Sequence, residues 1–410
     1  MGEMKRDKRL ILVFLLLLAG MSLLTISAFG SKETISDREN RALSAAPEFS
    51  WENLFSGDYL MGWEDYLVDH VPGREIMLTI ADAYKDHLGP EQSVMLVTTK
   101  ADMGVLTHSG ADQNQQLVVL SDRLLELYQY QPDTLKRYSQ AVIALAKTMP
   151  EAVSCYLLLA PNRVAFEEEA LRQLSDDQQT AIEEVYRETA QYVTPVQAYQ
   201  QLAEHQTEAI YFRTDHHWTM LGAYYGAQAF GQQAGFEMRP LADYDKHELE
   251  GFFGYLYQMS PTASIAKHPE VLDYYLLEGQ SDPLTCYYYD EDNKLDHFDS
   301  ETIIPSLAEE GANYGVFLGG DYPLMVIDGR QSNDRVLLVV KDSYGNALLP
   351  WLTPYFEKII AVDSRQYQGD LPSLAEEYAV TDFLVVDYIK ATMLPIYIDN
   401  LEQLAARGGK

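Results

Sequence analysis

Residues 336–352, VLLVVKDSYGNALLPWL, decide the fold class of this chain of 410 residues. The first five residues form a continuous apolar run, which is typical of a parallel strand buried on both faces. The polar residues Lys341, Asp342 and Ser343 end this run, and residues 344–356 have the pattern of a helix. A buried strand that leads straight into a helix is the unit from which parallel α/β sheets are built.

The same alternation of strand and helix continues on both sides of this stretch. Further strands are predicted at 93–100, 103–108, 152–161, 208–214, 358–364 and 382–389. Further helices are predicted at 122–149 with a break at Pro132, at 166–191, at 218–235 with a glycine stop, and at 371–379. The sequence therefore predicts an α/β fold with a mostly parallel sheet and helices on both faces.

Residues 240–335 interrupt this rhythm and predict a small β-rich insertion. Short strand patterns separated by turn residues lie at 273–279, 285–292 and 324–329. We expect these strands to be antiparallel and to belong to one α/β domain at 93–400. Residues 30–92, which are rich in polar and turn-forming residues at first, form an N-terminal extension.

The first 29 residues have the pattern of a membrane anchor. Four basic side chains lie in residues 1–9, and an uncharged apolar run follows at 10–29. Twenty helical residues span about 30 Å, the thickness of the hydrocarbon core of a bilayer. We expect a cytoplasmic basic segment, a single-pass transmembrane signal anchor at the cell membrane, and a domain outside the cytoplasm. A cleaved signal peptide is the alternative, since Ala28 and Gly30 are small, and the protein would then be secreted.

The charge of the chain excludes one class of partner. It has 30 basic and 62 acidic side chains, of which residues 1–9 hold four and two, so the remaining 26 and 60 carry a net charge of −34. Such a surface disfavours nucleic acids and anionic lipid headgroups. It is compatible with neutral sugars, or with cations that bridge it to an anionic cell wall.

The chain has two cysteines, Cys155 and Cys286. Cys155 lies in an apolar run and has the pattern of a buried small hydrophobic residue. A location outside the cytoplasm would allow a disulfide between the two, and the sequence leaves their pairing open.

Two polar sites follow predicted strands, where the chemistry of parallel sheets is found. One is TDHHW at 214–218, and the other is Ser343 at a strand-to-helix turn. A serine hydroxyl needs a base to remove its proton, and the base needs a carboxylate to orient it. Asp215 and His217 supply both, with the imidazole Nε2 left for the serine. The alternative for Asp215 is a helix N-cap.

The order of these motifs resembles that of the DHHW-motif family of bacterial surface proteins. More distantly it resembles the alginate O-acetyltransferases of the SGNH-hydrolase superfamily, which carry an Asp-x-His-Trp motif upstream of an Asp-Ser motif. The stretches at 38–50, 66–75 and 314–328 also match the family pattern, so the resemblance covers about residues 38–400. It implies an SGNH-hydrolase-like fold.

The resemblance also implies roles for individual residues. Ser343 would be the nucleophile, His217 the general base and Asp215 the residue that orients it. The activity would be acyl transfer to a surface glycan through an acyl-serine. His216 stands where the family pattern is variable, and it would compete with His217 for the role of base.

Several other residues are candidates for binding. The backbone N–H groups expected to stabilise an oxyanion are those of Ser343, Gly319, Gly320 and Asn333. The candidates for contact with substrate are Trp218, Tyr255, Tyr257, Arg213 and Lys341. The tryptophan also suits the core, the tyrosines suit ordinary strands, and the two cations suit neutralisation of local acidity.

No metal and no cofactor are predicted. Adjacent residues in an extended segment point to opposite faces, so His216 and His217 are not expected to bind one ion. Among the cysteines there is no metal-type spacing either.

The leading hypothesis is an O-acyltransferase, most simply an O-acetyltransferase, that modifies a cell-surface polysaccharide. A multi-pass membrane protein would deliver the acyl donor. Two alternatives stay open: a carbohydrate acetylesterase with the same triad, and a non-catalytic surface protein that binds glycan.

Overall fold

The structure is a computed structural model. It describes residues 35–36, 41–42, 46–47, 49–51, 53, 58–70, 95–101, 113–277, 282–290, 292–300 and 313–408. The expected basic segment, the expected anchor at 10–29 and the expected strand at 103–108 lie outside these ranges. Within them, no helix combines the length and the hydropathy needed to span a bilayer. The chain divides into a unit of residues 1–92 and 261–267 and a unit of residues 93–260 and 268–410.

The smaller unit contains little regular structure in its described ranges. Strand β1 (Ile35–Ser36) pairs antiparallel with β2 (Arg41–Ala42). Helix α3 (Asp58–Asp69) follows, and the short helix α11 (Ala263–Ala266) belongs to the same unit.

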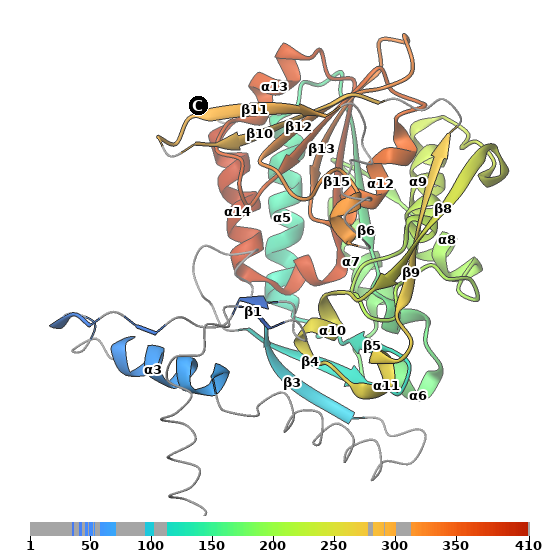
Figure 1. The fold of residues 1–410 in the computed structure, drawn as a ribbon. Helices are drawn as coiled ribbons and strands as arrows, with labels where there is room; N and C mark the ends of the chain where they lie inside the picture. Colours follow the sequence, from blue (N-terminus) through green and yellow to red (C-terminus); the bar gives the residue numbers. More distant parts are fainter. Residues whose placement is uncertain are drawn as a thin grey trace, which may run out of the picture. The chain divides into compact units, whose positions relative to one another are not determined.

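The larger unit is built on an eight-stranded sheet with the order β11-β10-β12-β14-β13-β15-β6-β7 (Figure 1). Five strands are parallel to one another: β14 (Lys358–Asp363), β13 (Val336–Lys341), β15 (Asp382–Tyr388), β6 (Ser154–Ala160) and β7 (Thr194–Val196). Three antiparallel strands extend one side: β12 (Leu324–Asp328), β10 (Leu284–Tyr289) and β11 (Leu295–Ser300). The sheet is therefore mixed and mostly parallel, as the sequence predicts.

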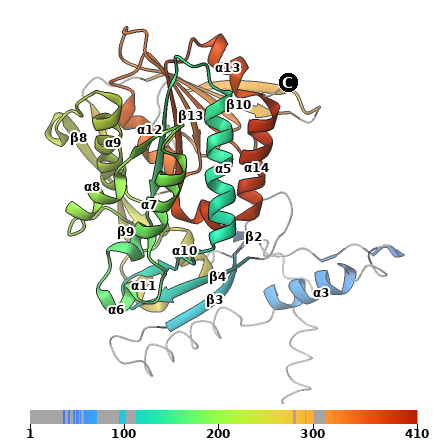
Figure 2. The same cartoon turned by 180° about the vertical axis from the view of Figure 1, so that it is seen from behind.

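Helices cover both faces of this sheet, and each face has its own hydrophobic core. Alternate residues of β6 belong to different cores, Leu157 and Leu159 to one and Leu158 and Ala160 to the other. Figures 1 and 2 show the two sets of helices on either side. One set is α5 (Pro132–Thr148), α7 (Gln178–Thr189), α13 (Leu371–Glu377) and α14 (Pro395–Arg407). The other is α8 (Ala198–Glu204), α9 (Met220–Ala234) and α12 (Tyr344–Leu352).

Smaller elements surround the sheet. A three-stranded antiparallel sheet contains β3 (Met95–Ala101), β4 (Gln113–Val119) and β5 (Leu124–Glu126). A hairpin pairs β8 (Tyr244–Phe252) with β9 (Glu270–Leu277). The short helices are α6 (Glu169–Arg172), α10 (Tyr255–Met259), and the 3-10 turns at Arg163–Phe166, Leu241–Asp243, Tyr314–Val316 and Ile389–Met393.

Local signals in the sequence place several helix ends correctly. Helix α5 begins at Pro132, whose missing N–H costs nothing in the first turn. Helix α9 begins after Thr219, whose hydroxyl accepts a hydrogen bond from the N–H of Gly222. It ends at Gly235, which adopts a φ of 76° that a side chain would disfavour.

Two predictions are wrong, because tertiary pairing overrides local pattern. Residues 124–126 were expected to be helical but form β5, where they pair with β4. Residues 208–214 were expected to form a strand but make only an isolated bridge, between Tyr211 and Trp218. The strands expected within 240–335 are antiparallel as predicted: β8 and β9 form a hairpin, whereas β10, β11 and β12 extend the main sheet. Cys155 and Cys286 are both free thiols.

Candidate active site

The candidate site lies where β13 ends at the carboxyl edge of the parallel strands. Lys341 is the last residue of β13 and pairs with Asp363 at the end of β14. Ser343 follows at the N-cap position of α12. On the opposite side of the site, residues 211–218 form a loop that is closed by the bridge between Tyr211 and Trp218 and leads into α9.

This loop brings Asp215 and His217 to Ser343. The Nδ1 atom of His217 lies 2.6 Å from Oδ1 of Asp215, and its Nε2 atom lies 2.7 Å from Oγ of Ser343. Both distances are those of hydrogen bonds. The bond between His217 and Ser343 joins residues that are 126 positions apart in the sequence. Asp215 and His217 are buried, whereas Ser343 is only half-buried, so its hydroxyl remains reachable. We call these three residues the triad.

Both carboxylate oxygens of Asp215 accept hydrogen bonds that fix its position. Oδ1 also accepts the backbone N–H of His217 at 2.9 Å, and Oδ2 accepts the N–H of Tyr255 at 2.8 Å. Gly254 lies so close that a Cβ there would be 2.2 Å from the Cβ of Asp215, so this position requires glycine. Burial opposes the charge of Asp215, but His217, His216 and these hydrogen bonds hold its pKa well below the usual range.

A buried glutamate fixes the start of the loop. Oε2 of Glu270 accepts the backbone N–H of Arg213 at 2.6 Å. Oε1 accepts the N–H of Thr214 at 2.6 Å and its hydroxyl at 2.5 Å. The Thr214 hydroxyl in turn accepts the N–H of Gly254 at 3.0 Å. These bonds position the loop without a helix or strand, so its residues depend on tertiary contacts.

Asp342 fixes the strand-to-helix turn on the serine side. Oδ1 accepts the N–H of Tyr344 and Oδ2 accepts the N–H of Tyr388, both at 2.8 Å. Burial and the charge of Asp387 raise the pKa of Asp342 to about 7. Burial likewise raises the pKa of Asp387 to about 6 against hydrogen bonds from two tyrosines. Burial and the like charge therefore raise the pKa values of both carboxyl groups toward neutral pH.

The backbone N–H of Ser343 is available to an oxyanion, because no group in the described part of the chain accepts a hydrogen bond from it. Its place before the first turn of α12 adds the positive end of the helix dipole. Gly319 and Gly320 lie in a turn with positive φ, next to Asp321, which pairs with Lys341. The N–H of Gly320 already donates to the carbonyl of Phe317 at 3.4 Å, and the role of Gly319 in an oxyanion hole stays a prediction.

Asn333 was a wrong candidate for the oxyanion hole. It lies before the first residue of β13, whereas Ser343 follows the last, so the six-residue strand separates them. At about 3.3 Å per residue this is about 20 Å. The side chain of Asn333 instead donates to the carbonyl of Tyr355 and accepts the N–H of Arg335.

Two residues expected to contact substrate are structural. Trp218 is fully buried and donates its indole N–H to the carbonyl of Tyr344 at 3.0 Å. Lys341 is also fully buried and forms an ion pair with Asp321 at 3.0 Å. A fully buried cation that is paired with a carboxylate is not free to bind a glycan.

Arg213 is engaged away from the triad. It donates to the carbonyls of Asp122 and His268, at 2.8 and 3.0 Å. It also lines a cavity of about 670 Å³ whose walls include no triad residue. Tyr255 and Tyr257 are half-buried beside the Asp215 loop, so their contact with a glycan stays a prediction.

Tyr314 is a residue of the site that the sequence did not single out. Its ring stacks on the imidazole of His217, with centroids 3.8 Å apart and planes 8° apart. Its hydroxyl donates to the carbonyl of Ser343 at 3.1 Å. The only signal was its place in the stretch at 314–328 that matches the family pattern, because nothing local marks a tyrosine as a partner of a distant histidine.

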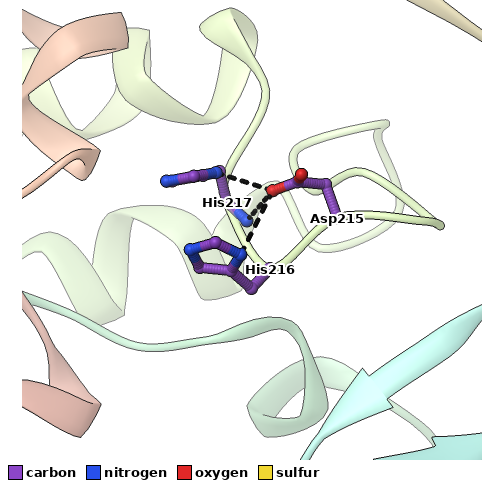
Figure 3. Close-up of side chains that lie close together, drawn as sticks. All are labelled: Asp215, His216 and His217. Carbon is purple, nitrogen blue, oxygen red and sulfur yellow. Dashed lines mark hydrogen bonds and ion pairs between the residues drawn. The ribbon is translucent and has the colours of Figure 1, made fainter. Parts of the chain in front are cut away.

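His216 lies beside His217 and also faces Asp215, as Figure 3 shows. The expectation that the two rings point to opposite faces is wrong, because the segment is bent rather than extended. One atom from each of Asp215, His216 and His217 falls within 4.8 Å of the others, a spacing open to a metal ion. Two atoms bound to one tetrahedral zinc would lie about 3.3 Å apart. The 2.6 Å between Asp215 and His217 is that of a hydrogen bond instead.

Comparisons with known proteins identify the fold and the family of this chain. A DHHW family protein from Eubacterium siraeum is similar in fold, with 27% sequence identity and a TM-score of 0.62 over 70% of this chain and 94% of that chain. Bacillus cereus PatB1 is also similar, with 21% identity and a TM-score of 0.58 over 69% of this chain and 99% of that chain. PatB1 with a sulfonyl adduct has 20% identity and a TM-score of 0.57 over 69% of this chain and 97% of that chain. No curated protein sequence matches the chain significantly. Residues 107–362 match the family model described as DHHW protein, so the chain belongs to the DHHW family.

Proposed function

We propose that this chain is an O-acyltransferase, most simply an O-acetyltransferase, that modifies a cell-envelope polysaccharide through an acyl group on Ser343. The observation that carries the proposal is the hydrogen-bonded series from Asp215 through His217 to Ser343. A carboxylate, an imidazole and a reachable hydroxyl in this order are the parts needed for nucleophilic acyl transfer.

In the first step, Oγ of Ser343 attacks the carbonyl carbon of the acyl donor, and its proton passes to Nε2 of His217. The donor's leaving oxygen takes that proton as its bond to the acyl group breaks. In the second step, a sugar hydroxyl attacks the acyl-serine and gives its proton to His217. The bond from the acyl carbon to Oγ then breaks, and Oγ recovers the proton.

Asp215 supports both steps by charge. It accepts the Nδ1 proton of His217, which fixes the tautomer that leaves Nε2 facing the serine. Its lowered pKa keeps it ionised at neutral pH, so it stabilises the imidazolium that forms. The N–H of Ser343 faces the developing oxyanion, a contact that contributes about 3 kcal/mol in such sites.

The variant Ser343→Ala tests the proposal directly. We expect it to abolish acetate release from a chromogenic acetyl ester and to leave the thermal melting temperature nearly unchanged, because the hydroxyl is half-buried and its loss makes little cavity. A sulfonyl fluoride should label wild-type Ser343, as detected by peptide mass spectrometry, and should not label the variant. Full activity in the variant would refute the proposal.

The same triad serves hydrolysis when water takes the place of the sugar, so an acetylesterase is the second candidate. Mass spectrometry of products with an added oligosaccharide distinguishes them. An O-acyltransferase gives acetylated oligosaccharide, whereas an esterase gives only acetate. A non-catalytic glycan-binding protein would show neither product, no labelling of Ser343, and oligosaccharide binding that survives loss of His217.

We further propose that the domain works outside the cytoplasm, tethered by residues 10–29, with a multi-pass membrane protein supplying the acyl donor. The charge of −32 on the whole chain favours an uncharged glycan or a cation-bridged wall over nucleic acid. Protease added to intact cells should digest the domain if it is external, and should leave it intact if it is cytoplasmic.

A further inference from the structure

The imidazoles of two adjacent residues, His216 and His217, both face Asp215. The rings of His216 and His217 have centroids 3.8 Å apart and planes inclined by 36°. Each ring directs Nδ1 toward the same atom, Oδ1 of Asp215, at 3.5 Å for His216 and 2.6 Å for His217. In Figure 3 the far nitrogen of each ring points away from Asp215 on the same side.

The charge of Asp215 sets where the proton of neutral His216 lies. Its Nδ1 atom is buried and has no hydrogen-bond partner, since 3.5 Å is too long for one. A lone pair on Nδ1 would face the carboxylate and be repelled, whereas an N–H there is attracted. The proton therefore lies on Nδ1, and Nε2 of His216 presents a bare lone pair that can only accept.

Nε2 of His216 has no acceptor role within the described structure. No described residue donates a hydrogen bond to it, and it is not among the buried atoms that lack a partner. The side chain is 17% exposed, so this atom faces space that a small group can enter. It does not serve Ser343, because Nε2 of His217 already lies 2.7 Å from that hydroxyl.

His216 is also unsuited to take a proton. Burial and the charge of His217 lower its pKa to about 4, against the opposing effect of Asp215. A group of this kind accepts a hydrogen bond at neutral pH but does not remove a proton from an alcohol. The general-base role thus stays with His217, and His216 is left with a role in binding.

We infer that His216 binds the acceptor sugar, and that the two adjacent Nε2 atoms select a pair of neighbouring hydroxyls. The hydroxyl that attacks the acyl-serine gives its proton to His217, and the hydroxyl on the next carbon donates a hydrogen bond to His216. This inference rests on the proposed function and narrows its substrate class to glycans with a free vicinal diol at the acylated unit.

Matched acceptors test the inference. Methyl glucopyranoside presents contiguous ring hydroxyls, and its 3-deoxy analogue retains only isolated ones. With a chromogenic acetyl ester as donor, we expect wild-type protein to acetylate the diol acceptor about five- to tenfold more efficiently than the analogue, the effect of one hydrogen bond. The analogue should not change the initial burst that reports acylation of Ser343.

Two variants at His216 complete the test. His216→Gln carries its amide near the position of Nε2 and should keep much of the preference, whereas His216→Asn carries it near Nδ1 and should lose it. The preference is the ratio of the two acceptors measured on one variant, so a change in the acylation rate that is common to both acceptors cancels, and melting curves check folding. A preference that survives in His216→Asn would overturn the inference.

Failure of the inference differs from failure of the proposed function. A wild-type burst with equal use of both acceptors, or with acetate as the sole product, overturns the diol role of His216 and leaves the serine chemistry intact. Absence of any burst and of Ser343 labelling in wild type overturns both.

Discussion

Asp215 belongs to the triad and lies in its histidine loop, whereas Asp342 directly precedes Ser343 in the sequence, and both are 4% exposed. Burial alone would raise the pKa of each. The pKa of Asp215 is nevertheless lowered, because two imidazoles and a backbone N–H surround it. The pKa of Asp342 is raised to about 7, because it faces a second buried carboxyl group, Asp387.

The difference shows that the neighbouring groups, rather than the degree of burial, decide whether the pKa of a buried carboxylate is raised or lowered. Asp215 stays ionised and can stabilise a charged imidazole. Asp342 has a pKa that burial and the charge of Asp387 raise, and it accepts two backbone N–H groups at the turn that carries Ser343. The comparison can be tested by changing each partner in turn.

Replacing each aspartate by asparagine should give the largest contrast. Asp215→Asn removes the charge that fixes the His217 tautomer, and we expect a loss of about 10³- to 10⁴-fold in the acylation rate. Asp342→Asn keeps an oxygen for one of its two N–H donors, and we expect less than about tenfold loss. Burst kinetics with a chromogenic ester, corrected for the folded fraction, measure both. Equal losses of the acylation rate in the two variants would contradict the different roles assigned to Asp215 and Asp342.

Tyr314 connects the two regions, since it stacks on His217 and donates to the carbonyl of Ser343. Tyr314→Ala removes the stacked ring, and we expect about a tenfold fall in the acylation rate, the upper end for one aromatic pair. Tyr314→Phe keeps the ring, and we expect a fall of about two- to threefold. If phenylalanine is as damaging as alanine, the hydroxyl rather than the stacking positions the site.

The pH dependence of stability should show the smallest effect. The folded pKa values of Asp342 and Asp387, about 7 and about 6, lie above those of an unfolded aspartate. The native state therefore binds more protons between about pH 4 and 7, and the free energy of unfolding falls as pH rises through this window. Asp215 acts oppositely but outside the window, because its pKa lies below it. His216, whose pKa is lowered to about 4, acts oppositely within the window and reduces the fall.

Asp387→Asn removes the like charge and should flatten this fall. Urea denaturation of wild type and variant at pH 5, 6, 7 and 8 measures it, and the matched control is Asp382→Asn, an aspartate at the other end of β15. A slope in Asp387→Asn that equals those of wild type and of Asp382→Asn would show that the charge of Asp387 does not raise the pKa of Asp342.

The sequence led to the candidate site although one strand predicted beside it is wrong. Residues 208–214 are not a strand, yet Asp215 and His217 still reach the carboxyl edge of the sheet. The serine side was predicted for the right reason, because β13 is a buried strand that turns into α12 at Ser343. The loop is held there by a hydrogen bond to Glu270 and by close packing against Gly254, and both residues are distant from it along the chain.

The candidate binding residues were less predictable for a physical reason. Trp218 and Lys341 are the types that bind glycans when exposed and hold cores together when buried, and burial is a property of the whole fold. Asn333 was misplaced although the predicted strand that begins at residue 336 already puts it at the opposite strand end from Ser343.

The sequence by itself determined four of the five parallel strands (β6, β13, β14 and β15, but not β7), the helix ends at Pro132 and Gly235, and the residue types of the triad, because hydrophobic periodicity and backbone conformational limits act locally. Only the tertiary structure decided that His217 meets Ser343, that Tyr314 stacks on it, and that two equally buried aspartates carry opposite pKa shifts. These features depend on contacts between residues far apart in the chain, and no local pattern encodes such contacts.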